Sequence, residues 1–243
     1  MEALPPNREI IYNDDMSVRK VPFVNGEYYH VYNRGVDKRI IFSDEDDMSR
    51  FIQSMVEFNV VEPIGSIYEK SFAEKRFGGK ASKTEGEKLV NFVTYCLNPN
   101  HFHFVLEQLA DNGIEKFMHK MGTGYTRYFN DKHKRSGVLF QGKYKATHID
   151  SNEYLLYVSA YVNLNDRVHR LGGKASKSVK SRSSWREYAG GLKGEPKTGF
   201  CAKDIVLDQF NNIEGYQDFA ESALESILER REDMKEMEGY LLE

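Results

Sequence analysis

The feature that most constrains the fold is the segment 98–106, which reads Asn-Pro-Asn-His-Phe-His-Phe-Val-Leu. In an extended strand, successive side chains alternate between two faces, so His101 and His103 share one face. The other face carries Phe102, Phe104 and Leu106. The apolar row predicts a strand anchored in a core, with two imidazoles roughly 7 Å apart on its opposite side. Such a pair is either a two-point metal site or a coincidence on a half-exposed strand, and other parts of the chain must decide between the two.

The segments around this strand indicate a mixture of strands and helices. Asn98-Pro99-Asn100 is a turn signal, so we expect 91–97 to pair with the His strand as a hairpin. Further strands are expected over 28–33 and within 138–149, where the pattern fits a strand pair or one long bent strand. Helices are expected over three segments: 44–58, 113–130, and from a Ser151 cap to about 164.

Composition places the chain among globular proteins with an aromatic-rich core, since 15 Phe and 15 Tyr occur in 243 residues. We expect neither a membrane span nor a secretory signal, because no apolar run approaches 18 residues. Cys96 and Cys201 lie far apart without metal-ligand spacing, so a reducing, cytoplasmic setting is expected.

Charge is strongly segregated along the chain. Residues 116–186 hold 15 Lys and Arg against 4 acidic residues, a net charge of +11, although the whole chain carries −3. This pattern is typical of a lysine-rich solvated face or of a surface for a polyanion. Interleaved aromatic residues favour a nucleic acid, since bases stack on rings while cations follow phosphates. The interleaved residues are Tyr125, Tyr128, Phe129, Phe140 and Tyr144.

The helix after Ser151 carries a second cluster. Tyr154, Tyr157, Tyr161 and Asn165 follow at helical spacing and are expected on one face. Tyrosine stripes usually pack in a core. Tyr161 and Asn165 differ because they lie at the helix end beside charged residues, where packing alone does not favour an amide.

In this order, the segments resemble the single-tyrosine HUH transposases, and in particular the REP-associated tyrosine transposases. The resemblance covers roughly 23–220 and is carried by Tyr29-His30-Val31-Tyr32-Asn33-Arg34-Gly35, Phe42 with 44–51, Asn98-Pro99-Asn100-His101-Phe102-His103, Tyr125-Thr126-Arg127-Tyr128-Phe129-Asn130 with Gly137, Gln141-Gly142-Lys143-Tyr144-Lys145, Tyr161-Val162-Asn163-Leu164-Asn165 and Ser183-Ser184-Trp185-Arg186-Glu187-Tyr188. The family usually has proline where Asp166 stands here.

The resemblance implies an α+β fold: a ferredoxin-like or RRM-like antiparallel sheet with the His strand central and helices on one face. The catalytic helix would close the site, and a C-terminal helical extension would follow. The expected domains are a loose arm over 1–20, a catalytic domain over 21–170 with a flexible insertion at about 69–88, a basic connecting segment over 171–203, and an acidic helical tail over 204–243. Gly-Gly-Lys-Ala-Ser-Lys occurs at both 78–83 and 172–177, in low-complexity segments that need not be structural repeats.

The resemblance also implies a metal-dependent transesterase that cleaves and rejoins hairpin-bearing single-stranded DNA through a 5′-phosphotyrosyl link. His101, His103 and Asn165 would be the ligands of Mg²⁺ or Mn²⁺, and Tyr161 the nucleophile. Tyr125 and Tyr128 are rival nucleophiles, but neither has a potential ligand at helical spacing. The DNA-binding residues would be Arg34, Arg127, Lys132, Lys134, Arg135, Lys143, Lys145 and Arg167. Of these, Arg167, Lys143 and Lys145 are candidates for activating the tyrosine.

Other interpretations stay open at this stage. The protein would be a non-cleaving regulator if it binds hairpins but has lost cleavage, or a small-molecule metallohydrolase if only the His pair matters. It would act as a monomer or a homodimer. His30 and His148 are either second-shell or structural residues. The acidic tail would pack on the domain, stay solvated or mask the basic face.

Overall fold

The structure is a computed structural model that describes residues 22–62, 86–168, 179–190 and 199–240, with side chains up to residue 231. The expected arm over 1–20, most of the expected insertion and both copies of the Gly-Gly-Lys-Ala-Ser-Lys motif lie outside the described residues.

Five described strands form one antiparallel sheet in the order β4-β1-β3-β2-β5. Their bounds are β1 Tyr28–Arg34, β2 Val90–Asn98, β3 His101–Gln108, β4 Lys145–Ile149 and β5 Arg182–Ser183. The predicted α+β class is confirmed, and the His strand β3 is central. Two expectations need correction. Only Lys145–Ile149 of the segment 138–149 is a regular strand, while Phe140 joins Gly35 in an isolated bridge. The connecting segment after 171 supplies the edge strand β5.

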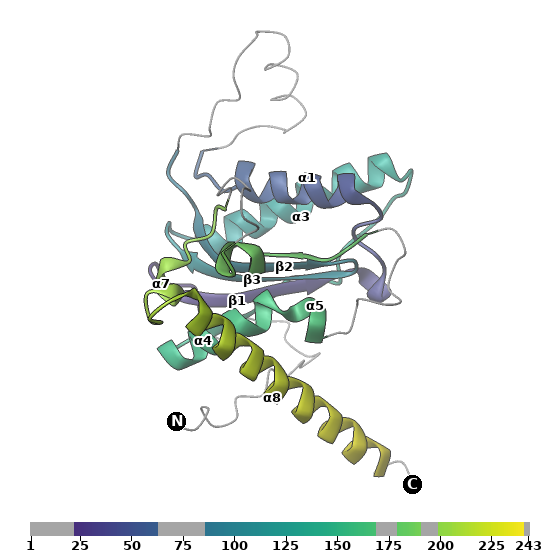
Figure 1. The fold of residues 1–243 in the computed structure, drawn as a ribbon. Coiled ribbons are helices and arrows are strands. Elements are labelled where there is room, and N and C mark those ends of the chain that lie inside the picture. Colours follow the sequence, from purple (N-terminus) through teal and green to yellow (C-terminus); the bar gives the residue numbers. More distant parts are fainter. Residues whose placement is uncertain (1–21, 63–85, 169–178, 191–198, 241–243) are drawn as a thin grey trace.

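One face of the sheet is a continuous apolar core under two helices. Alternation places Phe102, Phe104 and Leu106 of β3 on this face, as predicted. They pack with α1 Glu45–Glu57 and α3 Gly113–Lys132, which lie together above the sheet (Figure 1). Phe51 and Phe117 reach this core from the two helices and are almost fully buried. Burial of a side chain of this size stabilises the fold by about 1.5–3 kcal/mol.

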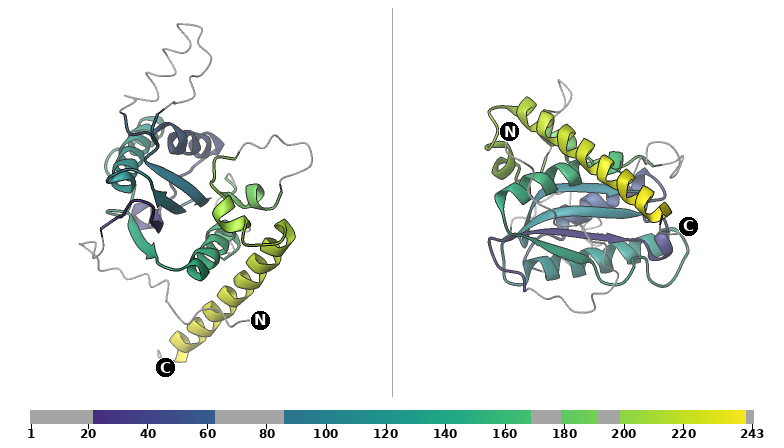
Figure 2. Two further views of the ribbon diagram at one scale, coloured as in Figure 1. Left: turned by 90° about the vertical axis from the view of Figure 1, so that its left-hand side faces the viewer. Right: turned by 90° about the horizontal axis from the view of Figure 1, so that it is seen from below.

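The opposite face is also covered, so helices occupy both sides of the sheet. Below it lie α4 Asn152–Asn163, α5 Asn165–Val168 and the long α8 Ile213–Tyr240. Figure 2 shows α8 running diagonally beneath α4. Tyr216, Ala220 and Ala223 of α8 are buried with Val158 and Val162 of α4 in a second core. The described start of the acidic tail therefore packs on the domain.

Two short helices connect the edge strand to α8. They are α6 Trp185–Tyr188 and α7 Asp204–Leu207. Tyr188 is fully buried, and its hydroxyl donates to the carbonyl of Val93 at 2.8 Å. This contact fixes α6 against strand β2, so the segment after residue 179 belongs to the same packed body as the sheet.

Local sequence signals set the ends of the helices. The carboxylate of Asp44 accepts from the backbone N–H of Asp47 and caps α1. Ser151 caps α4 in the same way through Tyr154. At the other end α4 stops at Asn163, Leu164 leaves helical geometry, and Asn165 begins α5. The spacing predicted one helical face for Tyr161 and Asn165, whereas the structure places them in two successive helices.

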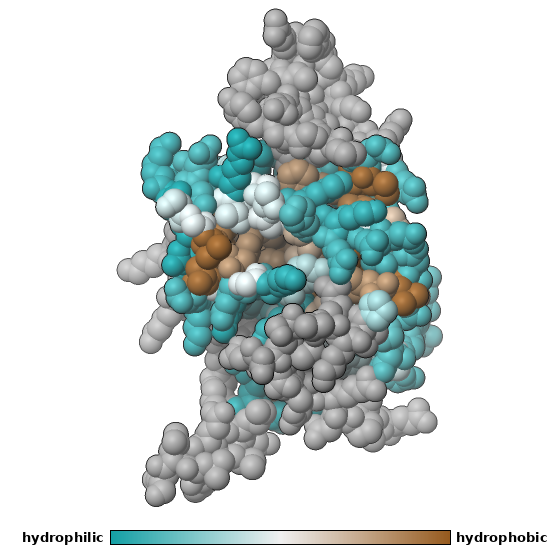
Figure 3. Space-filling view, turned by 180° about the vertical axis from the view of Figure 1, so that it is seen from behind, coloured by the Kyte–Doolittle hydropathy of each residue, from teal (hydrophilic) through white to brown (hydrophobic). Residues whose placement is uncertain are grey.

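The surface seen from behind is mostly hydrophilic, with apolar residues gathered in separate patches (Figure 3). The most exposed large apolar side chain among the described residues is Val138, with 68% of its surface accessible. It lies in the segment between α3 and β4, next to the cationic Arg135, whose guanidinium donates to the carbonyl of Val138.

Candidate metal centre

His101 and His103 lie at one end of the central strand, on the face that α4 covers. Strand register places Arg34 of β1 beside His101 and Tyr32 beside His103. On the other side, Asn98 at the end of β2 pairs directly with His101 across the two-residue turn. The two imidazole rings stand 5.2 Å apart and perpendicular to each other. The predicted pair of imidazoles is thus present on one face.

Asn165 reaches the same place from the helical side. Its Oδ1 lies 3.2 Å from the Nε2 of His101 and accepts a hydrogen bond of 2.8 Å from the Nδ2 of Asn98. Asn165 is fully buried, and its Nδ2 has no hydrogen-bond partner among the described residues. The amide oxygen therefore faces His101, although α4 ends before Asn165.

The proton on His101 is placed by its neighbour in the turn. The Nδ1 of His101 lies 2.6 Å from the Oδ1 of Asn100, which can only accept, so Nδ1 donates. Burial lowers the pKa of His101 to about 4, against a raising effect from Asn165, and nearby Arg34 lowers it further. The imidazole is therefore neutral near pH 7, with the lone pair on Nε2, and a neutral imidazole nitrogen is the form that binds metals.

His103 is held by a second buried histidine. The Nε2 of His30 lies 3.0 Å from the Nδ1 of His103, and the two rings stack at 5.2 Å. Tyr32 stacks on both rings. Burial lowers the pKa of His30 to about 3, so His30 is neutral and can accept the Nδ1 proton of His103. The Nε2 of His103 is then left with its lone pair, which is the usual way a second shell orients a metal ligand.

Tyr161 completes the cluster from α4. Its ring meets those of His103 and His30 edge-on, with centroids 5.6 and 5.9 Å away. Only 4% of Tyr161 is accessible. The rival Tyr125 lies in the core on the other side of the sheet, where its hydroxyl donates to the carbonyl of Ile41 at 2.6 Å. Tyr128 is also on that side, packed against this core. Of the three tyrosines, Tyr161 is therefore the one beside the histidines.

These side chains fit a small divalent cation. Ligands on adjacent octahedral positions of Mg²⁺ are about 3 Å apart, because each metal–ligand distance is about 2.1 Å. The 3.2 Å between the Nε2 of His101 and the Oδ1 of Asn165 agrees with this spacing. Two neutral imidazoles and one amide oxygen are also ligand types that such ions accept.

A second group of ligand types occurs on the α1 and α3 side. Within the described residues, the ligand atoms of Asp44, Asp47 and His133 lie within 4.8 Å of one another. The ammonium of Lys132 already contacts both carboxylates, at 2.6 Å from Asp44 and 2.9 Å from Asp47. The Nε2 of His133 donates to the carboxylate of Asp47 at 2.8 Å. The cationic position in this group is thus taken by a lysine of the same chain.

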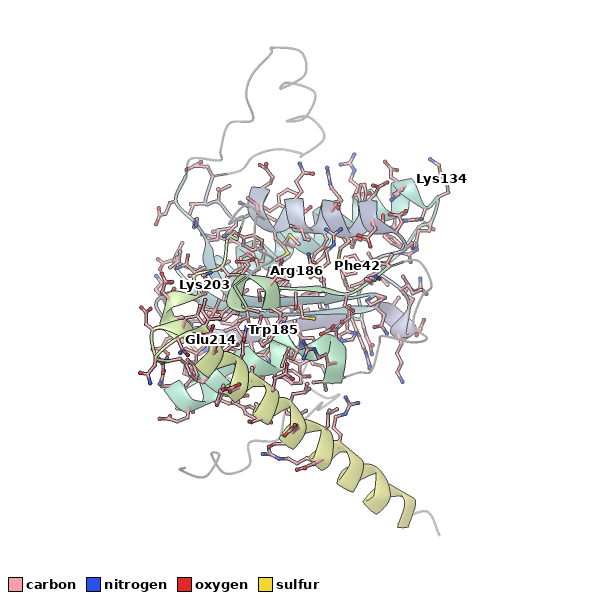
Figure 4. All side chains as sticks on the ribbon, in the orientation of Figure 1. Phe42, Lys134, Trp185, Arg186, Lys203 and Glu214 are labelled. Atoms are coloured by element: carbon pink, nitrogen blue, oxygen red, sulfur yellow. The ribbon has the colours of Figure 1, made fainter. Side chains whose placement is uncertain are left out.

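The basic residues predicted to bind DNA are spread over three regions. Arg34, Lys143 and Lys145 lie at the end of the sheet that holds His101, where Arg34 donates to Gln141. Figure 4 shows Lys134 at an outer corner of the helical layer, pointing away from the protein. Arg127 is exposed on α3, and Arg135 follows that helix. Lys132 is bound by the carboxylates, and Arg167 pairs with Glu221 of α8 at 2.5 Å.

A buried polar network joins this site to α8. Asn163 donates to the hydroxyl of Tyr216 at 2.8 Å and accepts from Ser184 at 2.6 Å. The hydroxyl of Ser184 in turn accepts from the backbone N–H of Tyr95 on β2. Asn163 lies between Tyr161 and Asn165, so this network fixes the end of α4 against both the sheet and α8. Sequence reasoning missed it, because no motif connects residues so far apart.

Part of the chain is similar to a known protein family. Residues 65–165 match the family model described as IS200-like transposase. This match confirms the predicted family resemblance. The IS200-like segment contains His101, His103, Tyr161 and Asn165, whereas β1 with His30 and the C-terminal helix α8 lie outside it.

A solved structure described as a REP-associated tyrosine transposase bound to a REP hairpin is similar to the chain at 13% identity and a TM-score of 0.44. The similarity covers 77% of this chain and 96% of that one. No curated protein matches the chain. None of the helices in the described ranges combines the length and apolar character that a membrane span requires.

Proposed function

We propose that the protein is a divalent-cation-dependent transesterase that cleaves and rejoins hairpin-bearing single-stranded DNA. The observation that carries the proposal is the convergence of His101, His103, Asn165 and Tyr161 from three elements onto one buried place. The match of 65–165 to the IS200-like transposases supports it independently. A small-molecule metallohydrolase leaves both Tyr161 and the basic segment without a role.

His101 and His103 through Nε2, and Asn165 through Oδ1, would hold Mg²⁺ or Mn²⁺. Such an ion polarises a phosphate and neutralises charge that develops on it. Asn100 and His30 would hold the two imidazoles in the tautomers that carry the lone pair on Nε2. These two residues therefore serve as positioning residues in the proposal.

Tyr161 would attack the DNA phosphorus through its phenol oxygen. The phenol loses its proton as the new bond joins that oxygen to phosphorus, the bond from phosphorus to the 3′-oxygen breaks, and the 3′-oxygen leaves as a hydroxyl after taking a proton. The product is a 5′-phosphotyrosyl link. Because the link conserves the energy of the phosphodiester, a 3′-hydroxyl can attack it in reverse and rejoin strands without a nucleotide cofactor.

The basic residues at this end of the sheet would lead DNA to the site. Arg34, Lys143 and Lys145 are the nearest of those predicted, by their strand positions beside His101 and Tyr32. Arg127, Lys134 and Arg135 would contact phosphates farther away. Lys132 would have to leave two carboxylates to take part, and Arg167 would have to leave Glu221.

Incubation of the protein with hairpin oligonucleotides and Mn²⁺ tests the proposal, with covalent adducts detected on a denaturing gel. The wild type should form an adduct, whereas Tyr161→Phe should form none. Tyr125→Phe is the matched control, because it removes a buried phenol on the other side of the sheet. It should keep adduct formation while losing about 1 kcal/mol of stability with its hydrogen bond.

An adduct formed by Tyr161→Phe contradicts the assignment of the nucleophile. The alternative function, a hairpin-binding regulator that does not cleave, predicts a different result. In that case the wild type binds the hairpin equally well in chelator and forms no adduct with any cation.

A further inference from the structure

Asn98 is a buried amide that faces two of the proposed cation ligands. Its Nδ2 lies 2.8 Å from the Oδ1 of Asn165 and 2.9 Å from the Nε2 of His101. The side chain is completely buried. In the sequence Asn98 was marked by the turn and by the motif that carries the family resemblance, and it entered no set of predicted ligands.

The side-chain N–H of Asn98 and a cation compete for the same lone pair, which lies on the Nε2 of His101. Because the Nδ1 of His101 carries the proton, its Nε2 can only accept, and the N–H of Asn98 points at that lone pair. A metal ion binds through the same lone pair. The Oδ1 of Asn165 also accepts from Asn98 and is a proposed ligand, but it has two lone pairs, so the bond to His101 is the one that blocks the cation. The arrangement in which Asn98 donates to both atoms therefore excludes a cation bound to both.

The amide of Asn98 has little to hold it in this orientation apart from these two bonds. Within the described residues, the hydrogen bond that its Oδ1 accepts is a long one of 3.7 Å from the thiol of Cys96, which is a weak donor. The backbone of Asn98 is fixed, since it is paired with His101 at the closed end of the β2–β3 hairpin. A half-turn of the amide exchanges Nδ2 for Oδ1 in the same place without moving the strand.

We infer that Asn98 is a further residue of the cation site, whose amide turns when a divalent cation binds so that its oxygen faces the ion. This inference rests on the proposed function of the site. Two amide oxygens that face each other repel, but a cation between them makes the same arrangement favourable. Without an ion the NH₂ group of Asn98 holds His101 and Asn165 in place. With an ion its oxygen serves either as a ligand or as an acceptor for water bound to the ion.

Mn²⁺ affinity of the full-length protein, measured by the electron paramagnetic resonance signal of free Mn²⁺, tests the inference without any DNA. Asn98→Asp places a charged oxygen of the same shape toward the ion and should raise affinity roughly tenfold or more, since ligand charge tunes such sites. Asn98→Leu has similar volume but no oxygen, and should lower affinity roughly tenfold or more.

Asn163→Asp is the matched control. Asn163 is equally buried and lies two residues from Asn165, but its amide faces Tyr216 and Ser184. A charge there should not raise Mn²⁺ affinity. An equal rise in Asn163→Asp and Asn98→Asp would overturn the inference, because it would show a general effect of added charge.

A second measurement does not depend on a variant that folds poorly. In ¹⁵N-labelled wild type, the side-chain amide signal of Asn98 should shift on addition of Mg²⁺ as its two hydrogen bonds are lost, and an unchanged signal at saturating Mg²⁺ would overturn the inference.

The variant His103→Ala separates failure of this inference from failure of the proposed function. If the wild type binds no Mn²⁺, the cation site itself fails. Suppose instead that the wild type binds Mn²⁺ and that His103→Ala abolishes this binding. If both Asn98 variants then bind Mn²⁺ with the affinity of the wild type, only the proposed role of Asn98 is refuted.

Discussion

Among the described residues, two regions gather side chains of the types that bind cations, and they differ in the donor that faces these side chains. In the group of Asp44, Asp47 and His133, the ammonium of Lys132 donates to both carboxylates. In the group of His101, His103 and Asn165, the facing donor is the neutral amide of Asn98. If the lysine moves away, the fully buried carboxylate loses its counter-charge, whereas an amide can turn in place.

The difference shows that ligand type and proximity do not define a metal site. Asp47 has no accessible side-chain surface, so it needs a permanent counter-charge, and Lys132 supplies one. The histidine group contains no carboxylate, and burial lowers the pKa of His101 in it and of His30 beside it. A neutral buried group can wait for a cation at no electrostatic cost, while the buried carboxylate of Asp47 cannot.

The largest effect is expected when one histidine is removed from each group. His101→Ala should lower Mn²⁺ affinity by roughly 100-fold or more, because it deletes a ligand and loss of an outer-shell partner alone typically costs 10–100-fold. His133→Ala should leave Mn²⁺ affinity unchanged. Titration followed by electron paramagnetic resonance compares the two, and a loss of affinity in His133→Ala would reverse our ranking of the groups.

Removal of the internal cation should be the next largest effect. Lys132→Met leaves Asp47 buried without its ammonium partner and should cost roughly 2–4 kcal/mol of unfolding free energy. Ca²⁺ should recover part of this loss in the variant, because the carboxylates are then free to bind it. Urea unfolding with and without Ca²⁺ measures both. Equal stability of wild type and variant would show that Lys132 is not essential to this group.

The smallest effect is expected from acid. Burial alone would raise the pKa of Asp44, but hydrogen bonds from Lys132 and from the backbone of Asp47, with the nearby charges, bring it below its usual value. A carboxyl with a lowered folded-state pKa stabilises the protein above its unfolded pKa of about 4, and this contribution is lost as pH falls through the folded value.

The unfolding free energy of the wild type should therefore fall below about pH 4, and part of that slope should disappear in Lys132→Met. Urea unfolding between pH 3 and 6 measures it. Asp44 is partly exposed, so the effect should also shrink in high salt. An identical slope in the variant would show that Lys132 does not set the pKa of Asp44.

Much of the fold followed from local patterns. The alternation of Phe102, Phe104 and Leu106 predicts the central strand, and the acids after Ser43 predict the start of α1, because period and capping are properties of adjacent residues. The end of α4 at Leu164 also agrees with the expected bounds of that helix. The packing of Asn163 between Tyr216 and Ser184 was not predictable in this way, because these partners come from distant segments.

The residues of the candidate site were likewise predictable only in part. The pair of histidines, Tyr161 and Asn165 was identified from spacing and family resemblance, and the structure brings all four together. The residues around them were not identified. His30 was one of two isolated histidines, yet strand pairing places it against His103, while His148 pairs with Glu27 at the exposed edge of the sheet.

The sequence by itself determined which residues lie on which face of each strand and helix, because side-chain periodicity and capping act over a few residues. It also determined which functional groups are present: two imidazoles, a phenol and an amide. Only the tertiary structure decided which of these groups meet, which histidines are neutral, and which cluster already has a cation. Those properties depend on burial and on partners from distant segments, as with Lys132 at Asp47 and Asn98 at Asn165.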